Sequence, residues 1–248
     1  MATGSEALEG VAQASSLVKI ERRRRLDHRF YLGMALAMAF GVFAGFTKTY
    51  YARSYFHSPA IPFWVHVHGA VFTGWMLFYL LQCLLAMYGG MKLHRSLGIV
   101  GGLLASGVVI MGSAIAIRQA REGRFFPFPD IYSSLTISFG QMALFAVFLY
   151  LSLKMRRDSE AHKRFILMAT QLFFFPAFGR LLHGVNLVTL LLALGFYVAG
   201  PLYDRVTRGS VHRVYRWGVP LLILTMPPFG VLASHAPLVR HALDSIVH

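Results

Sequence analysis

Seven apolar segments, each close to the length of one membrane crossing, recur along this 248-residue chain. A helix that crosses the hydrocarbon layer of a bilayer needs about 20 mostly apolar residues. Charged residues make up only 14% of the chain, against about 25% in ordinary soluble domains. The sequence therefore predicts an all-α fold, a polytopic transmembrane bundle of about seven helices. The segments lie at residues 30–47, 60–88, 97–117, 131–153, 165–183, 185–203 and 217–237.

Composition excludes three other classes of protein. A hydrophobic content of 56% is far above that of disordered chains. The one cysteine, Cys83, rules out a fold held together by disulfides. A chain with so few polar residues also cannot form the hydrophilic exterior of a soluble nucleic-acid-binding protein. We therefore expect the lipid bilayer, and no nucleic acid, as the partner of this chain.

The basic residues are divided unevenly between the two sides of the predicted membrane domain. If the amino terminus lies inside, 17 of the 24 Lys and Arg residues are inside and 7 are outside. Because Lys and Arg concentrate in cytoplasmic loops, seven spans place the amino terminus inside and the carboxy terminus outside. The net charge of +14 is then expected to meet anionic phospholipid at the inner face of the membrane.

Three regions follow from this topology. Residues 1–29 contain four consecutive arginines and lack the apolar run of a signal peptide, so we expect a disordered cytoplasmic tail. Residues 30–237 form the transmembrane domain, and residues 238–248 form a short outer tail. The stretch from residue 165 to residue 203, which holds the fifth and sixth segments, has 39 residues, too many for one crossing at about 1.5 Å per residue. We therefore expect a tight hairpin at residues 183–186.

Small residues and prolines indicate how the helices pack. Two rows of small residues at four-residue spacing are Gly98, Gly102 and Ser106 in the third segment, and Gly41 and Gly45 in the first. Such rows let helices approach closely, within the chain or between copies in a homo-oligomer. Pro176 and the pair Pro227 and Pro228 remove backbone donors, so they predict kinks in the fifth and seventh segments.

Few ionisable side chains lie at membrane depth, and they gather toward the outer side. They are His66, His68, Arg180 and His183. No Asp or Glu lies within a predicted span, which argues against an ion-coupled transporter. Arg180 lies one turn from His183 and suits an anionic group, such as a haem propionate, a quinone oxygen or a lipid phosphate. The alternative is that Arg180 and His68 pair only with backbone carbonyls and phospholipid.

A second pattern marks the inner side, where four helices are expected to begin with His followed by a base. The pairs are His28-Arg29, His94-Arg95, His162-Lys163 and His212-Arg213. Helix amino termini with His and Arg form good anion sites, although the bases also follow from the positive-inside rule alone. Ligation of haem by two histidines needs imidazoles at the same depth on facing helices. Two pairs meet that condition: His94 with His162 inside, and His68 with His183 outside.

The spacing of several of these residues resembles a family of uncharacterised bacterial predicted membrane proteins. The matching residues are His66-x-His68-Gly69, Trp75, Gln82, His94-Arg95-x-Leu97-Gly98, His162-Lys163-Arg164-Phe165 and Arg180. The resemblance covers residues 60–185 and implies a multi-pass protein of the bacterial inner membrane. The four-helix core is also similar in outline to cytochrome b561-type proteins, which implies b-type haem between helix-borne histidines. The segment 131–153 contains no His, so the resemblance implies one haem rather than two.

Three functional hypotheses follow. The most specific is a redox protein that binds haem b through histidines among His68, His94, His162 and His183, with Arg180 near an anionic group. The second is a protein that handles anionic lipid or another anion, as a transporter or as an enzyme acting on headgroups. The third is a non-enzymatic assembly subunit. The sequence predicts no catalytic residue, and no metal other than haem iron.

Overall fold

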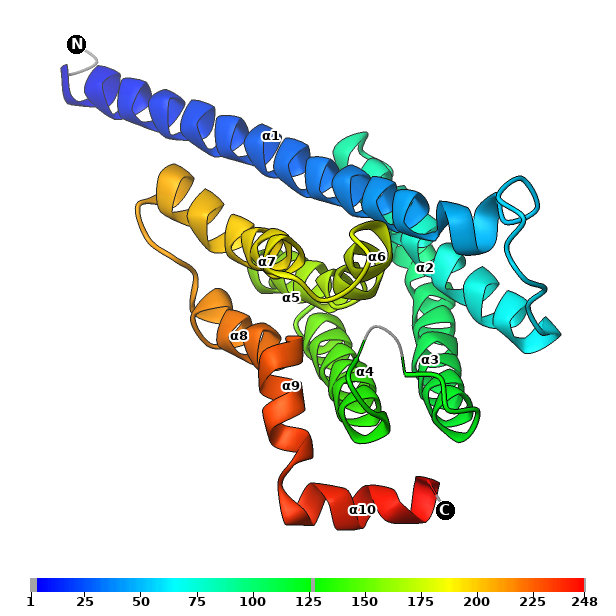
Figure 1. Ribbon diagram of the computed structural model, residues 1–248. Helices are drawn as coiled ribbons and strands as arrows, with labels where there is room; N and C mark the ends of the chain where they lie inside the picture. The colour runs from blue at the N-terminus through cyan, green and yellow to red at the C-terminus, as the bar shows by residue number, and fades with distance from the viewer. Residues whose placement is uncertain (1–3, 126–127, 248) are drawn as a thin grey trace.

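The chain folds into a bundle of helices, with no strand among residues 4–125 and 128–247, which the computed structural model describes (Figure 1). The predicted all-α fold is therefore confirmed. The helices are α1 (Gly4–Phe46), the π-helical turn η1 (Thr47–Tyr51), α2 (Phe63–Met87), α3 (Met91–Arg121), α4 (Ile131–Lys154), α5 (Ser159–Gln171), α6 (Phe174–Leu181), α7 (Leu187–Arg208), α8 (Arg213–Leu224), α9 (Pro227–Ser234) and α10 (Pro237–Val247).

Five of the described helices are long and apolar enough to cross a membrane: α1 with η1, α2, α3, α4 and α7. Helices α8 and α9 together make a sixth candidate, bent by 61°. The predicted fifth span, residues 165–183, is not one spanning helix, because α5 has 13 residues and α6 has 8. The structure thus supports a multi-pass membrane protein with five or six candidate spans in its described part, rather than seven.

The helix breaks occur at the predicted prolines. A proline clashes with the carbonyl four residues earlier and lacks an N–H, and Leu172, four residues before Pro176, lies at the break between α5 and α6. Pro227 is the first residue of α9, at the bend that follows α8. The predicted kinks are therefore confirmed. The hairpin is also confirmed, because Arg164 near the start of α5 pairs with Asp204 near the end of α7.

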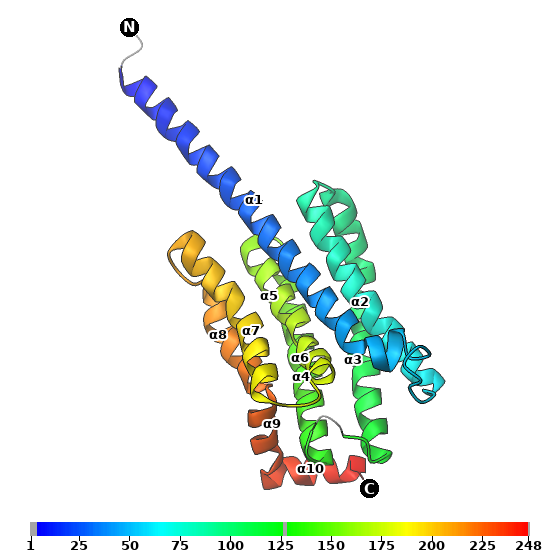
Figure 2. The ribbon, with the colours of Figure 1, turned by 45° about the horizontal axis from the view of Figure 1, so that its top comes forward.

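Helices occupy the described parts of both terminal regions. Helix α1 begins at Gly4 where we expected a disordered tail, and Figure 2 shows its first half projecting beyond the bundle. This segment is rich in Ala, Leu, Glu and Arg, which favour helix. At the other end, α10 replaces the expected tail. It buries Leu243, while Tyr132 at the start of α4 donates a hydrogen bond to Asp244 (2.8 Å).

Helix α5 occupies the centre of the bundle. It packs against α4, α7 and α8, and its side chains include the fully buried Arg164 and Leu167. A helix this enclosed meets protein rather than lipid on most of its surface. Its short length is therefore compatible with burial, and its amino-terminal turn is held at a fixed place between α4 and α7.

The two rows of small residues differ in what they contact. Gly41 and Gly45 lie directly against α6, where a Cβ would collide with the Phe174 ring and the Ala177 backbone, so close packing is confirmed there. Gly98 and Gly102 have no such neighbour, since an added Cβ would meet nothing within 4 Å. Within the chain, this row does not support a close helix contact. It borders a cavity instead.

Candidate functional site

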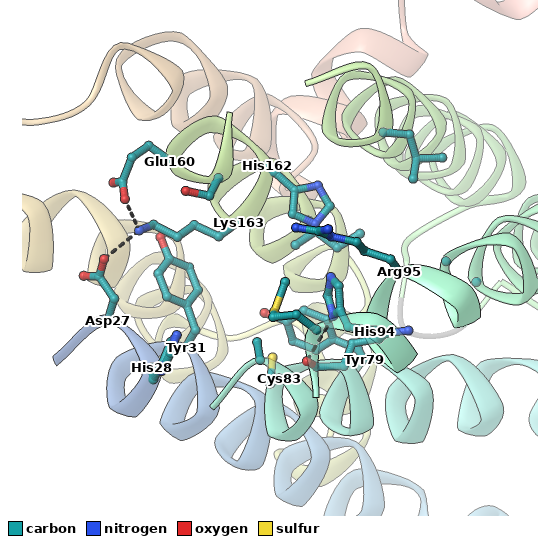
Figure 3. Close-up of a pocket in the computed structure, with 18 of the residues that line it drawn as sticks. Asp27, His28, Tyr31, Tyr79, Cys83, His94, Arg95, Glu160, His162 and Lys163 are labelled. Atoms are coloured by element: carbon teal, nitrogen blue, oxygen red, sulfur yellow. Dashed lines mark hydrogen bonds and ion pairs between the residues drawn. The ribbon is translucent and has the colours of Figure 1, made fainter. Parts of the chain in front are cut away.

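A cavity of about 850 Å³ lies at the end of the bundle where α3 and α5 begin (Figure 3). Its walls come from α1, α2, α3, α4, α5 and α7. The deeper part is apolar and aromatic, with Trp75, Phe78 and Ile166, whereas the exposed Arg23 and Arg95 lie at its rim. A volume of a few hundred to 1,000 Å³ with mostly apolar walls and a few polar groups is typical of small-molecule and cofactor sites.

His94 and His162 extend into this cavity toward each other from two helix starts (Figure 3). Helix α3 begins after the glycine pair 89–90, so that His94 falls in its first turn. Helix α5 begins at the cap Asp158, whose carboxylate accepts hydrogen bonds from the backbone N–H groups of residues 160 and 161. The two ring centres lie 6.3 Å apart with the planes at 84°. The structure therefore brings together the inner pair of histidines that the sequence predicted.

Polar contacts orient both imidazoles. His162 Nδ1 lies 2.9 Å from the carbonyl oxygen and 2.9 Å from the hydroxyl of Ser152, and His94 Nδ1 lies 3.4 Å from the carbonyl oxygen of Gln82. A carbonyl oxygen only accepts, so in the tautomer in which Nδ1 donates to it, Nε2 keeps a free lone pair. Burial also lowers the pKa of His162, which favours its neutral form. A neutral imidazole oriented through its second nitrogen is the usual state of a histidine that binds a metal.

The α2 wall of the cavity carries buried polar atoms without partners. Trp75 is 2% exposed, and its indole nitrogen has no hydrogen-bond partner in the part of the chain that the structure describes. The side-chain oxygen and nitrogen of Gln82 are also buried without a partner there. Buried polar groups are nearly always hydrogen-bonded in native proteins. These three atoms are exceptions to that rule, enclosed by protein in the α2 wall.

An ion-pair network closes the side of the cavity between α1, α5 and α7. Asp27 on α1 accepts hydrogen bonds from Lys163 (2.6 Å), from Arg208 (2.6 and 2.8 Å) and from the Tyr203 hydroxyl (2.6 Å). Glu160 pairs with the same two bases. Because the network joins three helices, it fixes the amino-terminal turn of α5, on which His162 lies.

One pair of this network is fully buried. Arg164 donates two hydrogen bonds to Asp204, at 2.9 and 2.5 Å, and both side chains are 0% exposed. The predicted spans contain no acid: Asp204 lies one residue beyond the span 185–203, and Asp27 lies before the span 30–47. Both residues belong to helices that are long and apolar enough to cross a membrane, α7 and α1. Acid and base four residues apart, at Glu160 with Arg164 and at Asp204 with Arg208, were the signal that could have revealed the network.

The rim of the cavity has an excess of positive charge. The two carboxylates in the wall, Asp27 and Glu160, are both engaged by Lys163 and Arg208. Three exposed arginines at the rim form no ion pair within residues 4–125 and 128–247: Arg23, Arg24 and Arg95. Guanidinium groups bind carboxylates and phosphates well. The rim therefore favours the anionic end of a ligand whose body is apolar.

The outer residues do not converge in the same way. His183 is exposed in the turn after α6, and no hydrogen bond or ring contact joins it to His68 in the described structure. His68 packs instead on the Phe72 ring, with centres 4.2 Å apart. Arg180 donates to the Pro176 carbonyl (3.1 Å) and lies 4.6 Å from the centre of the Phe46 ring. Arg180 therefore pairs with a backbone carbonyl, as in the alternative, whereas the buried Nδ1 of His68 has no hydrogen-bond partner in the described structure.

The four His-base pairs divide into two kinds. His28, His94 and His162 all line the cavity. His212 caps α8 instead, where its Nδ1 accepts from the backbone N–H of Val214 (3.3 Å). Three of the four His-base pairs therefore contribute a histidine to the wall of the cavity.

A scan against protein-family models and searches of the curated proteins and of the solved structures found no match to this chain.

Proposed function

We propose that this chain is a membrane-embedded electron-transfer protein that binds one b-type haem between His94 and His162. The observation that carries the proposal is the facing pair of imidazoles, 6.3 Å apart between ring centres, each with Nδ1 bound to a carbonyl. His94 and His162 would hold the haem iron through their ring nitrogens, and two imidazoles at this separation leave room for one metal ion between them.

The walls of the cavity fit the other parts of a haem. Gly98 and Gly102 present backbone without side chains on the same helix as His94, which leaves room for a flat ring. The apolar part of the cavity suits the porphyrin, and the exposed Arg24 and Arg95 suit its two carboxylates. When bound, the haem would supply a reversible one-electron carrier. The chain would hold the ring through two Nε2 atoms, exclude water with apolar walls and balance the carboxylates with arginines.

The proposed setting is the inner membrane of a bacterium, with the amino terminus and the cavity on the cytoplasmic side. This orientation is supported by the uneven division of basic residues, 17 on one side and 7 on the other in the predicted topology. The basic rim then faces anionic headgroups. Association of copies through small residues stays a prediction.

Haem titration of the purified full chain in detergent tests the proposal. We expect a Soret band that saturates at one haem per chain, and its loss in H162A. The matched control is H212A, which removes a histidine that caps α8 outside the cavity and should bind haem as the wild type does. Absence of a saturable band in the wild type, or equal bands in both variants, would contradict the proposal.

A second candidate function is the binding of an anionic lipid-like amphiphile in the same cavity. It is favoured by the rim arginines Arg23, Arg24 and Arg95 above an apolar interior. In that case the purified protein should retain anionic phospholipid, and the double variant R24Q/R95Q should lose it. The matched control is R156Q, an exposed arginine that does not line the cavity. Retention of lipid by the double variant would overturn this candidate.

A further inference from the structure

Helix α10 crosses the end of the bundle instead of running along it. Figures 1 and 2 show it beside the end of α3 and the start of α4, and it contacts both of these helices and α9. The apolar cluster that it closes contains Leu243, Val239, Ile246, Ala116, Ala120 and Leu135. Because α3 and α4 are both candidate spans, their ends mark the boundary between the apolar spans and the polar surface. Helix α10 therefore lies at the level of this boundary.

The apolar side chains of α10 share one side of the helix. At about 100° per residue, they fall within an arc of about 140°, and they are Leu238, Val239, Ala242, Leu243 and Ile246. The polar residues Arg240, His241 and Asp244 fall on the opposite side. This separation is typical of a helix that lies in the plane of a membrane interface, and also of a helix that packs on protein. The exposure of the apolar side chains distinguishes the two.

The bundle covers only part of the apolar side of α10. Leu243 is 7% exposed, whereas Leu238 is 81% exposed and Ala242 is exposed as well. On α9, which leads directly into α10, Phe229 and Leu232 are also exposed. Because α8 and α9 together form a candidate span, the uncovered side of α10 continues the apolar surface of that span. Large exposed apolar surfaces mark sites of contact with protein or membrane, and around a membrane span the contact is with acyl chains.

Two arginines at the same level have no carboxylate partner in the described part of the chain. Arg121 in the last turn of α3 donates to the Ile246 carbonyl of α10, and Arg240 donates to the Ser234 carbonyl, each at 3.3 Å. Both arginines are exposed, and the ion pairs at this end involve Arg118 and Arg124 instead. A guanidinium held by one carbonyl keeps further N–H donors, which suit the phosphate of a phospholipid. The charges therefore favour headgroups beside α10.

We propose that α10 is an interfacial helix, lying in the plane of the bilayer with Leu238 and Ala242 against acyl chains and with its polar side at the phospholipid headgroups. The partner is the lipid surface itself, in the leaflet that the predicted topology places outside. Lipid then covers the part of the apolar side that the bundle leaves open, and α10 joins the ends of α3 and α4 at that depth. This inference goes beyond the proposed function. It does not depend on the histidine pair, which lies where α3 and α5 begin, at the other end of α3.

Quenching of a fluorescent label tests the depth of α10. A242C and H241C are each introduced into the full chain carrying C83A, labelled with a thiol-reactive NBD dye and reconstituted in vesicles of phosphatidylcholine and phosphatidylglycerol. The two positions are neighbours on one helix and both are exposed, so H241C is the matched control. We expect doxyl groups on the acyl chains to quench the label of A242C roughly threefold more strongly than that of H241C, and aqueous iodide to show the reverse. L103C, at an exposed position of α3, calibrates quenching by acyl chains.

Every other pattern overturns the inference. Equal quenching at the two positions would show that they do not differ in depth, as they must in an interfacial helix. A label of A242C that is shielded from both iodide and doxyl lipid would show that a second copy or another protein covers this side. The haem proposal is tested separately, because the quenching pattern should be unchanged in the H162A background. A chain that shows the expected pattern but binds no haem would contradict only the haem proposal.

Discussion

The two ends of the bundle carry the same residue types but arrange them differently. At the predicted inner end, His94 and His162 face each other across a cavity, and each ring contacts a carbonyl group. At the predicted outer end, His183 is exposed, and Arg180 donates to a backbone carbonyl and lies over an aromatic ring. Helix packing thus gives His94 and His162 a carbonyl partner and a shared cavity, and within the described residues it gives His183 neither.

The largest expected difference between the two ends concerns their arginines. Replacing the fully buried Arg164 by Met removes the shorter of the two ion pairs of Asp204 and leaves Arg208 (3.2 Å) as its charged partner, so we expect a loss of about 3 kcal/mol in the free energy of unfolding. R180M removes one hydrogen bond to a carbonyl and should cost about 1 kcal/mol. Denaturant titrations in detergent measure both. The double variant R164M/D204L should recover most of the loss, and equal losses in R164M and R180M would contradict the comparison.

A smaller difference is expected between two carboxylates. D27N keeps the shape of Asp27 but weakens its bonds to Lys163, Arg208 and Tyr203, so we expect a loss of about 1–3 kcal/mol. Asp130 at the outer end caps α4, and D130N should cost well below 1 kcal/mol because asparagine is also a good cap. Thermal unfolding of the two variants tests this order. A larger loss of stability in D130N than in D27N would contradict this order.

The smallest expected effect is a pH dependence at Glu160. Burial raises the pKa of this carboxyl, but hydrogen bonds from Lys163 and Arg164 outweigh burial, and the net shift is downward from 4.5. A carboxyl with a lowered pKa in the folded state stabilises the fold above its ordinary pKa, and this contribution is lost as the pH falls through the lowered value. The side chain is 44% exposed, so solvent screening should limit the effect to below about 1 kcal/mol.

The unfolding temperature, measured from pH 6 to pH 3, tests this effect. The wild type should lose more stability than E160Q below pH 4.5, because the glutamine has no proton to gain. Parallel curves for the two proteins would show that Glu160 does not contribute in this way.

Hydropathy predicted the long apolar helices but not the short, enclosed helices of the predicted fifth span. The five long helices coincide with apolar segments. Apolar residues are favoured both where a helix contacts lipid and where it contacts other apolar side chains. The segment around Phe173 and Phe175 is equally apolar, yet both rings are buried in protein, and a break falls four residues before Pro176. Hydropathy does not distinguish a helix that faces lipid from one that is enclosed by other helices.

The candidate site was predictable in part. The His-base pattern at the helix starts identified His94 and His162, since residues near the starts of neighbouring helices tend to lie at one depth. The ion-pair network was missed because its partners are far apart in the sequence: Asp27 and Arg208 are separated by 181 residues. Only the packing of α1 against the ends of α5 and α7 brings these charges together.

The measurement that tests the central claim most directly is the reduced-minus-oxidised absorption spectrum of the purified chain and of four histidine variants, all made in haem-replete cells. We predict a b-type spectrum in the wild type, in H68A and in H183A, and its loss in H94A and in H162A. A wild-type protein without this spectrum, or a spectrum lost in the outer variants and kept in the inner ones, would contradict the account.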